Sequence, residues 1–263
     1  MPLLKTAAVT LKSRKWGDAD RIVTLFTQRY GKLRGVARGA RRMKSRFGSA
    51  LEPFVHCELN LFEKPHDPLH RVSQADIRET FPRLREDLAA MAGAARLANL
   101  VTAITAEGDA SPVVFDTVLD GLRALNEGGE PGLTTLLFQI RLLGQTGFRP
   151  QTDHCAACSG AFNENEMAGQ MRFSAVAGGL VCVPCAGRRS DRPLPLSPGS
   201  RSFLQQALQL PVSTLTRLRA AGLVRDELDA AVEAYVLVVA GRRLPPVDFL
   251  AAAEREPAYI AKR

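Results

Sequence analysis

The sequence contains no apolar run approaching the roughly 20 residues that a membrane-spanning helix requires. Its N-terminus also lacks the long apolar stretch and the small-residue cleavage site of a secretory signal. We therefore expect a cytoplasmic protein with no membrane partner and no extracellular disulfide framework. Hydrophobic residues make up 46% of the chain and charged residues 24%, a composition that excludes a disordered polypeptide.

The common catalytic motifs are missing as well. The chain has no G-x-x-x-x-G-K-[ST] phosphate loop, no H-E-x-x-H zinc motif and no G-x-S-x-G nucleophile turn. ATP hydrolysis, zinc hydrolysis and serine hydrolysis therefore lose their usual sequence support, and we predict a protein that is not an enzyme. Asp18 and Asp20 remain as candidates for a catalytic metal site, but two acids in a turn beside Arg21 are typical of an ordinary surface turn.

Acidic residues are absent from residues 29–48, RYGKLRGVARGARRMKSRFG, where cations are crowded. The cations are Arg29, Lys32, Arg34, Arg38, Arg41, Arg42, Lys44 and Arg46. Residues 1–80 hold 16 Lys and Arg against 8 Asp and Glu, while residues 81–263 hold 19 of each, so the net charge of +8 arises in the first third. Such density is self-repulsive unless a polyanion lies against it, and we predict contacts between these eight cations and nucleic-acid phosphates. A solvated basic loop is the alternative.

The first 80 residues have the pattern of a β-barrel. Five segments rich in β-branched or aromatic residues, separated by Gly, Asp or Pro signals, predict strands at 7–16, 21–29, 32–40, 53–64 and 69–77. In the fourth, Val55, Cys57, Leu59 and Leu61 alternate with His56, Glu58 and Asn60. This alternation is typical of a sheet with one buried side, and it places Cys57 in the core. Five strands with a longer third connection predict a small closed barrel of the OB type, a fold that binds oligonucleotides.

Aromatic residues near this barrel are candidates for stacking on unpaired bases. We consider Trp16, Tyr30 and Phe47 for this role, with burial in the barrel as the alternative for each. Phe26 and Phe62 are expected in the core.

Past residue 80 the apolar period changes from two to three or four, which predicts helices. The expected apolar positions are Leu84, Leu88, Met91, Ala95, Ala98 and Val101, followed by Val114, Val118, Leu122 and Leu125, and then by the segment 133–147. Ser197 and Pro198 are typical of an N-cap and first helical residue, and Gly241 of a helix end. Asp226, Glu227 and Asp229 are expected to open the last helix, where acids favour the helix dipole.

Four of the five cysteines form two C-x-x-C pairs between the helical groups. Cys155 pairs with Cys158, and Cys182 with Cys185, with 23 residues between the pairs. Two such turns predict one structural Zn²⁺ per chain, because four thiolates leave no open position for water. Disulfides and redox chemistry are the alternatives, and His154 is an alternative ligand.

The predicted fold class is a multidomain α+β protein in which a five-stranded OB-fold barrel precedes an α-helical domain with an inserted four-cysteine zinc finger. We divide the chain into an OB-fold DNA-binding domain at 1–80, a first helical part at 81–150, a zinc-finger insertion at 151–190 and a second helical part at 191–263.

The N-terminal run resembles the bacterial recombination mediators of the RecO family. It carries a Gly-acid-x-Asp turn at residues 17–20, an "LFT…G" hairpin at residues 25–31 and the stretch ARGARRMKSRFG at residues 37–48. With the helical remainder and the zinc-binding insertion, the resemblance covers nearly the whole chain. The segment GRRLPPVDFL departs from the family pattern, because Pro245, Pro246 and Val247 stand where a Lys-Ser-Arg-like stretch is expected.

The resemblance implies an ATP-independent protein of recombinational DNA repair, associated with the bacterial nucleoid. Such proteins bind single- and double-stranded DNA, anneal complementary strands, engage the single-strand-binding protein SSB, and act with RecR to load RecA. An acidic SSB tail with apolar residues would fit an apolar helical groove with a cation, for which Arg141 is a candidate.

Two rival classes stay open at this point. One is an RNA-binding OB protein, which would prefer RNA to a matched DNA oligonucleotide at equal salt. The other is a metal-dependent nuclease or transferase that uses Asp18 and Asp20 and turns over with magnesium or manganese.

Overall fold

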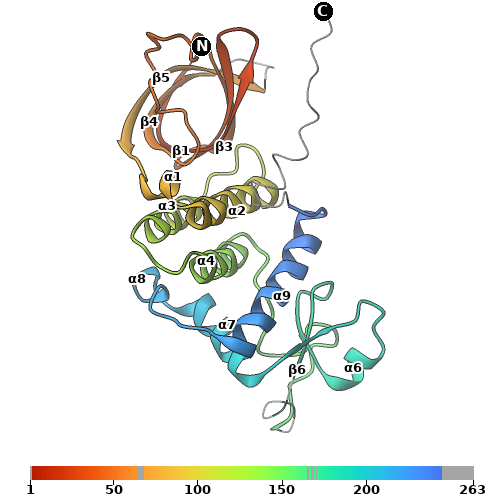
Figure 1. Ribbon diagram of the computed structural model, residues 1–263. Coiled ribbons are helices and arrows are strands. Elements are labelled where there is room, and N and C mark those ends of the chain that lie inside the picture. The colour runs from red at the N-terminus through yellow and green to blue at the C-terminus, as the bar shows by residue number, and fades with distance from the viewer. Residues whose placement is uncertain (1, 64–67, 165, 167–168, 170, 245–263) are drawn as a thin grey trace, which may run out of the picture.

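Five strands at the N-terminus close into a barrel, drawn in red and orange at the top of Figure 1. The computed structural model describes residues 2–63, 68–164, 166, 169 and 171–244, so Pro245, Pro246 and Val247 lie outside the described residues. The strands are β1 (Leu3–Trp16), β2 (Asp20–Thr27), β3 (Gly31–Ala37), β4 (His56–Phe62) and β5 (Leu69–Glu79). Their order around the barrel is β1-β2-β3-β5-β4, and β1 pairs with β4 to close it. The predicted OB-type barrel is confirmed.

Alternation along the strands builds the barrel core. Val55, Cys57, Leu59 and Leu61 are fully buried, as their spacing predicts, and Cys57 is a core residue. The opposite face of β4 is covered too, because His56 lies edge-on to the ring of Phe115 in the helical domain. Burial in this position lowers the pKa of His56. One side of the barrel is therefore an interface with the helices.

The helices lie below the barrel in Figure 1. They are α1 (Arg83–Glu86), α2 (Leu88–Ile104), α3 (Pro112–Asn126), α4 (Pro131–Gln145), α7 (Pro198–Gln209), α8 (Val212–Leu215) and α9 (Gly222–Ala240). The Ser197 hydroxyl accepts from the Ser200 N–H and Pro198 begins α7, as predicted. Gly241, at a φ of 64°, ends α9 in the left-handed conformation, which is also as predicted.

The buried face of α2 differs from the expected one. Leu88 is 65% exposed, whereas Ala90, Ala94, Leu97 and Val101 are fully buried. The cause is that α2 packs against α3, α4, α9 and β1, so that its covered face is wide and is set by its neighbours. In an alanine-rich helix, the apolar spacing alone is compatible with more than one choice of buried face.

Glu227 lies in the second turn of the last helix, and its role differs from the predicted one of an acid that opens the helix. Its side chain is buried, and its Oε2 accepts hydrogen bonds from the Ser197 N–H at 2.7 Å and from the Ser200 hydroxyl at 2.6 Å. Glu227 therefore holds the N-terminus of α7 against α9 and is not a solvated acid of the first turn.

A shared core and several polar contacts fix the barrel on the helices. The rings of Phe26 and Phe115 stack with centroids 6.5 Å apart, and Phe26 is buried as expected. The Arg123 guanidinium binds the Glu79 carboxylate at 2.8 Å. Gly31, at a φ of 61°, approaches the Asp109 backbone so closely that a Cβ there would lie 2.0 Å from the Asp109 carbonyl oxygen. Only glycine fits this contact.

Among the described helices, none combines the length and the apolarity that crossing a bilayer demands.

Candidate nucleic-acid interface and metal centre

The basic connection between β3 and β4 is fastened to the β1–β2 hairpin. The Asp20 carboxylate accepts a hydrogen bond from the Gly39 N–H at 2.8 Å, and the Arg41 N–H donates to the Ala19 carbonyl at 2.8 Å. The Arg41 guanidinium also donates to the carbonyls of Gly17 and Asp18, at 3.2 and 3.0 Å. Hairpin and connection therefore form one surface.

These contacts also define the surroundings of Asp18 and Asp20. The Asp20 carboxylate is used as a backbone acceptor. Over the described residues, the cysteine cluster below is the one group of three or more potential metal ligands, so no third ligand joins these two acids.

Six of the eight predicted phosphate-binding cations are exposed and have no paired carboxylate among the described residues: Arg29, Arg38, Arg41, Arg42, Lys44 and Arg46. The guanidinium of Arg46 lies 4.9 Å from the centre of the Phe47 ring. Unneutralised like charges this close together are costly without an anion. The five cations of the connection between β3 and β4, which are Arg38, Arg41, Arg42, Lys44 and Arg46, are called the basic connection surface below. Arg29 is not part of it, because it lies in the β2–β3 turn at the other end of the barrel.

Lys32 and Arg34 have partners inside the protein. The Lys32 ammonium donates to the carbonyls of Thr102, at 2.7 Å, and Thr105, which belong to the C-terminal end of α2. Arg34 forms an ion pair of 2.9 Å with Glu107. Burial lowers the pKa of Lys32, and its position suits a cation at a helix C-terminus. Both residues join β3 to the helical domain, so each has a partner within the protein, and their contact with phosphates stays a prediction.

The three candidate stacking residues lie in different environments. Trp16 is 57% exposed at the end of β1, beside the basic connection surface. Tyr30 is half-buried against the barrel core. The prediction for Phe47 is wrong, because its ring is buried in the barrel with 3% exposed, and a base cannot reach it. Phe62, expected in the core, is half-buried.

Sequence reasoning missed two exposed cations that lie beside this surface and not within it. Arg14 and Lys15 are exposed on β1 next to Trp16, close to the hairpin tip. Both residues lie at the end of a predicted strand, directly before a turn. Residues beside a hairpin tip project beyond the sheet, so this position could have indicated that they are exposed.

The metal module follows α4. Its elements are β6 (Met171–Ser174), β7 (Gly179–Val181), α6 (Val183–Gly187) and β8 (Leu194–Leu196), with the strand order β7-β6-β8. The module packs on α9, where the rings of Phe173 and Tyr235 meet edge to face with centroids 5.8 Å apart. Its apolar residues belong to the same core as the helices.

The structure brings together the four cysteines predicted to bind metal. The Sγ atoms of Cys155, Cys158, Cys182 and Cys185 all lie within 4.8 Å of one another, and none is in a disulfide. The Sγ atoms of Cys158 and Cys182 are 3.9 Å apart. Tetrahedral bonds of about 2.3 Å require sulfur separations of about 3.8 Å, so the cluster fits a metal ion held by four thiolates. His154 is exposed and outside the cluster.

Backbone N–H groups favour the thiolate form of one of the four cysteines, Cys155. Burial by itself would raise the pKa of Cys155, but N–H groups of Cys182, Cys158 and Ala157 point at the sulfur and lower the pKa to about 6. The Cys182 N–H lies 3.3 Å from the Cys155 Sγ. At Cys155 this favours the deprotonated form that a metal ligand needs. Burial raises the pKa of Cys182, and the neighbouring sulfurs of Cys182 and Cys158 raise the pKa of Cys185 to about 12.

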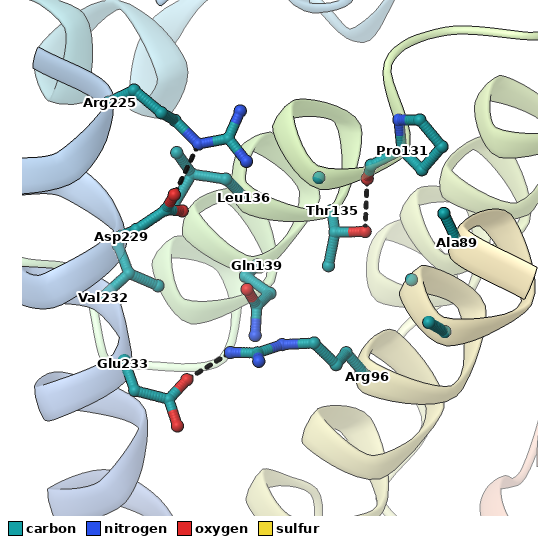
Figure 2. A pocket seen from close by; sticks show the side chains of 13 residues that line it. Ala89, Arg96, Pro131, Thr135, Leu136, Gln139, Arg225, Asp229, Val232 and Glu233 are labelled. Carbon is teal, nitrogen blue, oxygen red and sulfur yellow. Dashed lines mark hydrogen bonds and ion pairs between the residues drawn. The ribbon is translucent and has the colours of Figure 1, made fainter. Parts of the chain in front are cut away.

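Arg141, the candidate for the SSB tail, lies between two helices. Its guanidinium donates to the Leu208 carbonyl at 2.9 Å, which joins α4 to the end of α7. The cations that line a hollow of the helical domain are instead Arg96 and Arg225. This hollow, of about 550 Å³, opens between α2, α4 and α9 (Figure 2).

The fold and its sites define a class of protein: an OB-type barrel with an exposed basic surface, joined to a helical domain with a cluster of four cysteines that could bind a metal ion. The family model for the N-terminal part of recombination protein O matches residues 1–81, and that for the C-terminal part matches residues 85–246. The chain therefore belongs to the RecO family of DNA repair proteins.

Curated relatives agree with this assignment. The chain is 34% identical to the DNA repair protein RecO of Symbiobacterium thermophilum over 252 residues, which cover 95% of this chain and 97% of the relative. It is 34% identical to RecO of Myxococcus xanthus, over 93% of this chain and 95% of the relative. It is 29% identical to RecO of Bacillus subtilis, over 94% of both chains.

Proposed function

We propose that this protein is an ATP-independent recombination mediator that binds single- and double-stranded DNA and anneals complementary strands. The observation that carries the proposal is the basic connection surface, where exposed cations without carboxylate partners lie beside the exposed Trp16 on an OB-type barrel. Relatives named DNA repair proteins support the same role. We further propose that it acts in the bacterial cytoplasm, at the nucleoid.

The proposed mechanism needs no covalent step. Cations of the surface neutralise phosphates and release their counterions, which favours binding at low salt. The indole of Trp16 stacks on an unpaired base without regard to its identity. Two strands bound in this way repel each other less, so that complementary bases can pair and leave as a duplex.

We propose zinc as the metal of the cysteine cluster, in a structural role. Four thiolates that can surround one ion tetrahedrally are a ligand set that zinc prefers, and they leave no coordination position for a reacting water. The ion would fix the metal module on α9.

The test of the proposed function is annealing of complementary oligonucleotides, followed by fluorescence without nucleotide. We expect faster annealing of bare strands and also of strands coated with SSB, the latter with RecR present in parallel samples. Separate samples that also contain RecA and ATP measure RecA loading. Equal rates with and without the protein at low salt would contradict the proposal.

The SSB tail is proposed to dock in the hollow between α2, α4 and α9. Arg96 lies opposite Glu233 at its mouth, and Arg225 pairs with Asp229 at 2.6 Å (Figure 2). Arg225 also pairs with Glu130 at 2.9 Å. Gln139 is 3% exposed, and its Nε2 has no hydrogen-bond partner among the described residues. A carboxylate of an acidic tail would satisfy this amide and draw Arg96 from Glu233.

Calorimetry with a tail peptide tests this dock on the full chain. We expect Arg96→Glu to weaken binding at least tenfold, because it places a negative charge at the mouth. The control is Arg85→Glu, an exposed cation of α1 that does not line the hollow. Unchanged affinity of the Arg96→Glu variant would place the peptide elsewhere.

A further inference from the structure

A second, smaller hollow of about 250 Å³ lies where the barrel meets α2. Its wall on the barrel side includes Lys12 and Arg14 of β1 and the ring of Phe54, and its floor includes Ala95 and Asn99 of α2. Small side chains on α2 leave the space open. The hollow is separate from the basic connection surface and from the hollow of Figure 2.

A β-bulge directs Lys12 into this hollow. Partners of β1 on β2 run from Thr10 opposite Leu25 to Lys12 opposite Thr24, so Leu11 is the extra residue. Such a bulge puts two successive side chains on one face of a strand. Leu11 accordingly joins the helical core and Lys12 follows it on the same outer face. In a regular strand Lys12 would point into the apolar interior of the barrel.

The backbone opposite the bulge is strained. Phe54 has a φ of 65°, a left-handed conformation that non-glycine residues rarely adopt, and its N–H donates to the Thr10 carbonyl at 2.7 Å. Strain of this kind persists where the surrounding structure enforces it, often beside a binding site. Here it holds the Phe54 ring as one wall of the hollow.

Lys12 is half-buried without a partner of opposite charge. No ion pair or hydrogen bond joins its ammonium to another described residue. Burial lowers its pKa, and so does the positive charge of Arg14, Arg242 and Lys32, with no carboxylate acting in the opposite direction. Arg242 comes directly after the end of α9. A partly buried cation among other cations is unfavourable unless an anion joins them.

We propose that this hollow, which Lys12 and Arg14 line and Arg242 adjoins, is a further phosphate-binding site for a nucleic-acid backbone. It rests on the proposed DNA-binding function and adds to it a contact outside the basic connection surface. The outer face of β1 connects the hollow with the basic connection surface. Every second residue of a strand lies on the same face, and on this face of β1 these residues are Lys12, Arg14 and Trp16. At about 3.3 Å per residue, this path from the hollow to the hairpin tip is roughly 13 Å long.

Continuity with the basic surface favours nucleic acid over an acidic protein segment as the occupant. The strand leads from the hollow to Trp16, and exposed cations flank it along the way. An acidic peptide has no bases to stack on the Trp16 ring, whereas a single strand of nucleic acid presents phosphates and bases together.

The first test is the salt dependence of binding to an oligothymidylate. The double variant Lys12→Gln with Arg242→Gln should make the slope of log K against log salt less steep by about 1.4, since each lost phosphate contact contributes about 0.7 on single strands. Folding should be preserved, because the change removes an unpaired, partly buried cation. The control is Arg172→Gln with Arg188→Gln, two exposed cations of the metal module, whose slope should equal that of the wild type.

The second test is acetylation of lysines in the wild-type chain, read by mass spectrometry. Lys12 should be acetylated in the free protein and protected by bound oligothymidylate, while Lys32 stays unreactive in both because its ammonium is hydrogen-bonded to α2. Protection of Lys44 without protection of Lys12, or an unchanged slope in the double variant, would overturn this site and leave the proposed function standing. Absence of binding by the wild-type chain would overturn both.

Discussion

Annealing should be lost when Arg38, Arg41, Arg42 and Lys44 are all changed to Glu. If the wild-type surface neutralises about five phosphates of a single strand, log K should fall against log salt with a slope of roughly −3.5. The charge-reversed variant should show weak binding and a much flatter slope, because reversal adds repulsion as well as removing attraction. Fluorescence anisotropy over a salt series and the annealing assay give the two measurements.

Arg41 requires a companion variant, because its guanidinium also holds the hairpin tip. The triple variant Arg38→Glu, Arg42→Glu and Lys44→Glu keeps that contact, and it should bind nearly as poorly. Exposed charges contribute little to stability, so the triple variant should melt close to the wild-type temperature.

The matched control reverses three exposed cations far from the barrel, with Arg172→Glu, Arg188→Glu and Arg217→Glu. Its change in net charge equals that of the triple variant, so a general effect of charge would appear in both. A folded triple variant that anneals with the wild-type salt slope would show that residues 38–46 are a solvated loop and that DNA binds elsewhere.

Removal of one metal ligand should have the second large effect. Cys155→Ser is expected to abolish binding of one zinc per chain, as measured by elemental analysis, and to lower the melting temperature by about 10 °C or more. The reason is that the binding free energy of a structural zinc site, about 10–16 kcal/mol in isolated peptides, stabilises the folded state. Each lost kcal/mol corresponds to roughly 2–4 °C in a domain of this size. Cys182→Ser should behave alike.

Cys57→Ala is the control for this experiment. Cys57 is buried in the barrel, where burial raises its pKa to about 12, so its replacement should leave the zinc content unchanged.

DNA binding by Cys155→Ser should persist below its melting temperature, because the basic connection surface belongs to the barrel. Protein purified without chelator that contains no zinc would contradict the assignment of the metal.

Features set by local chemistry could be predicted from the sequence. Alternation of Val55, Cys57, Leu59 and Leu61 predicts a half-buried strand, and five such segments predict the barrel. Two C-x-x-C turns predict a metal cluster, because each turn already places its sulfurs close together. The cap at Ser197 and the helix end at Gly241 follow for the same reason, since every interaction involved spans only a few residues.

What the sequence determined by itself was therefore the presence of the barrel, the helices and the cysteine cluster, together with the location of the excess charge. Only the tertiary structure decided which charges have partners within the protein. Lys32 binds a carbonyl 70 residues further along the chain, and Phe47 turns into the barrel core. Glu227 caps a helix that begins about 30 residues before it. A side chain's burial and partners depend on segments distant in sequence that folding brings beside it, and no local pattern encodes that proximity.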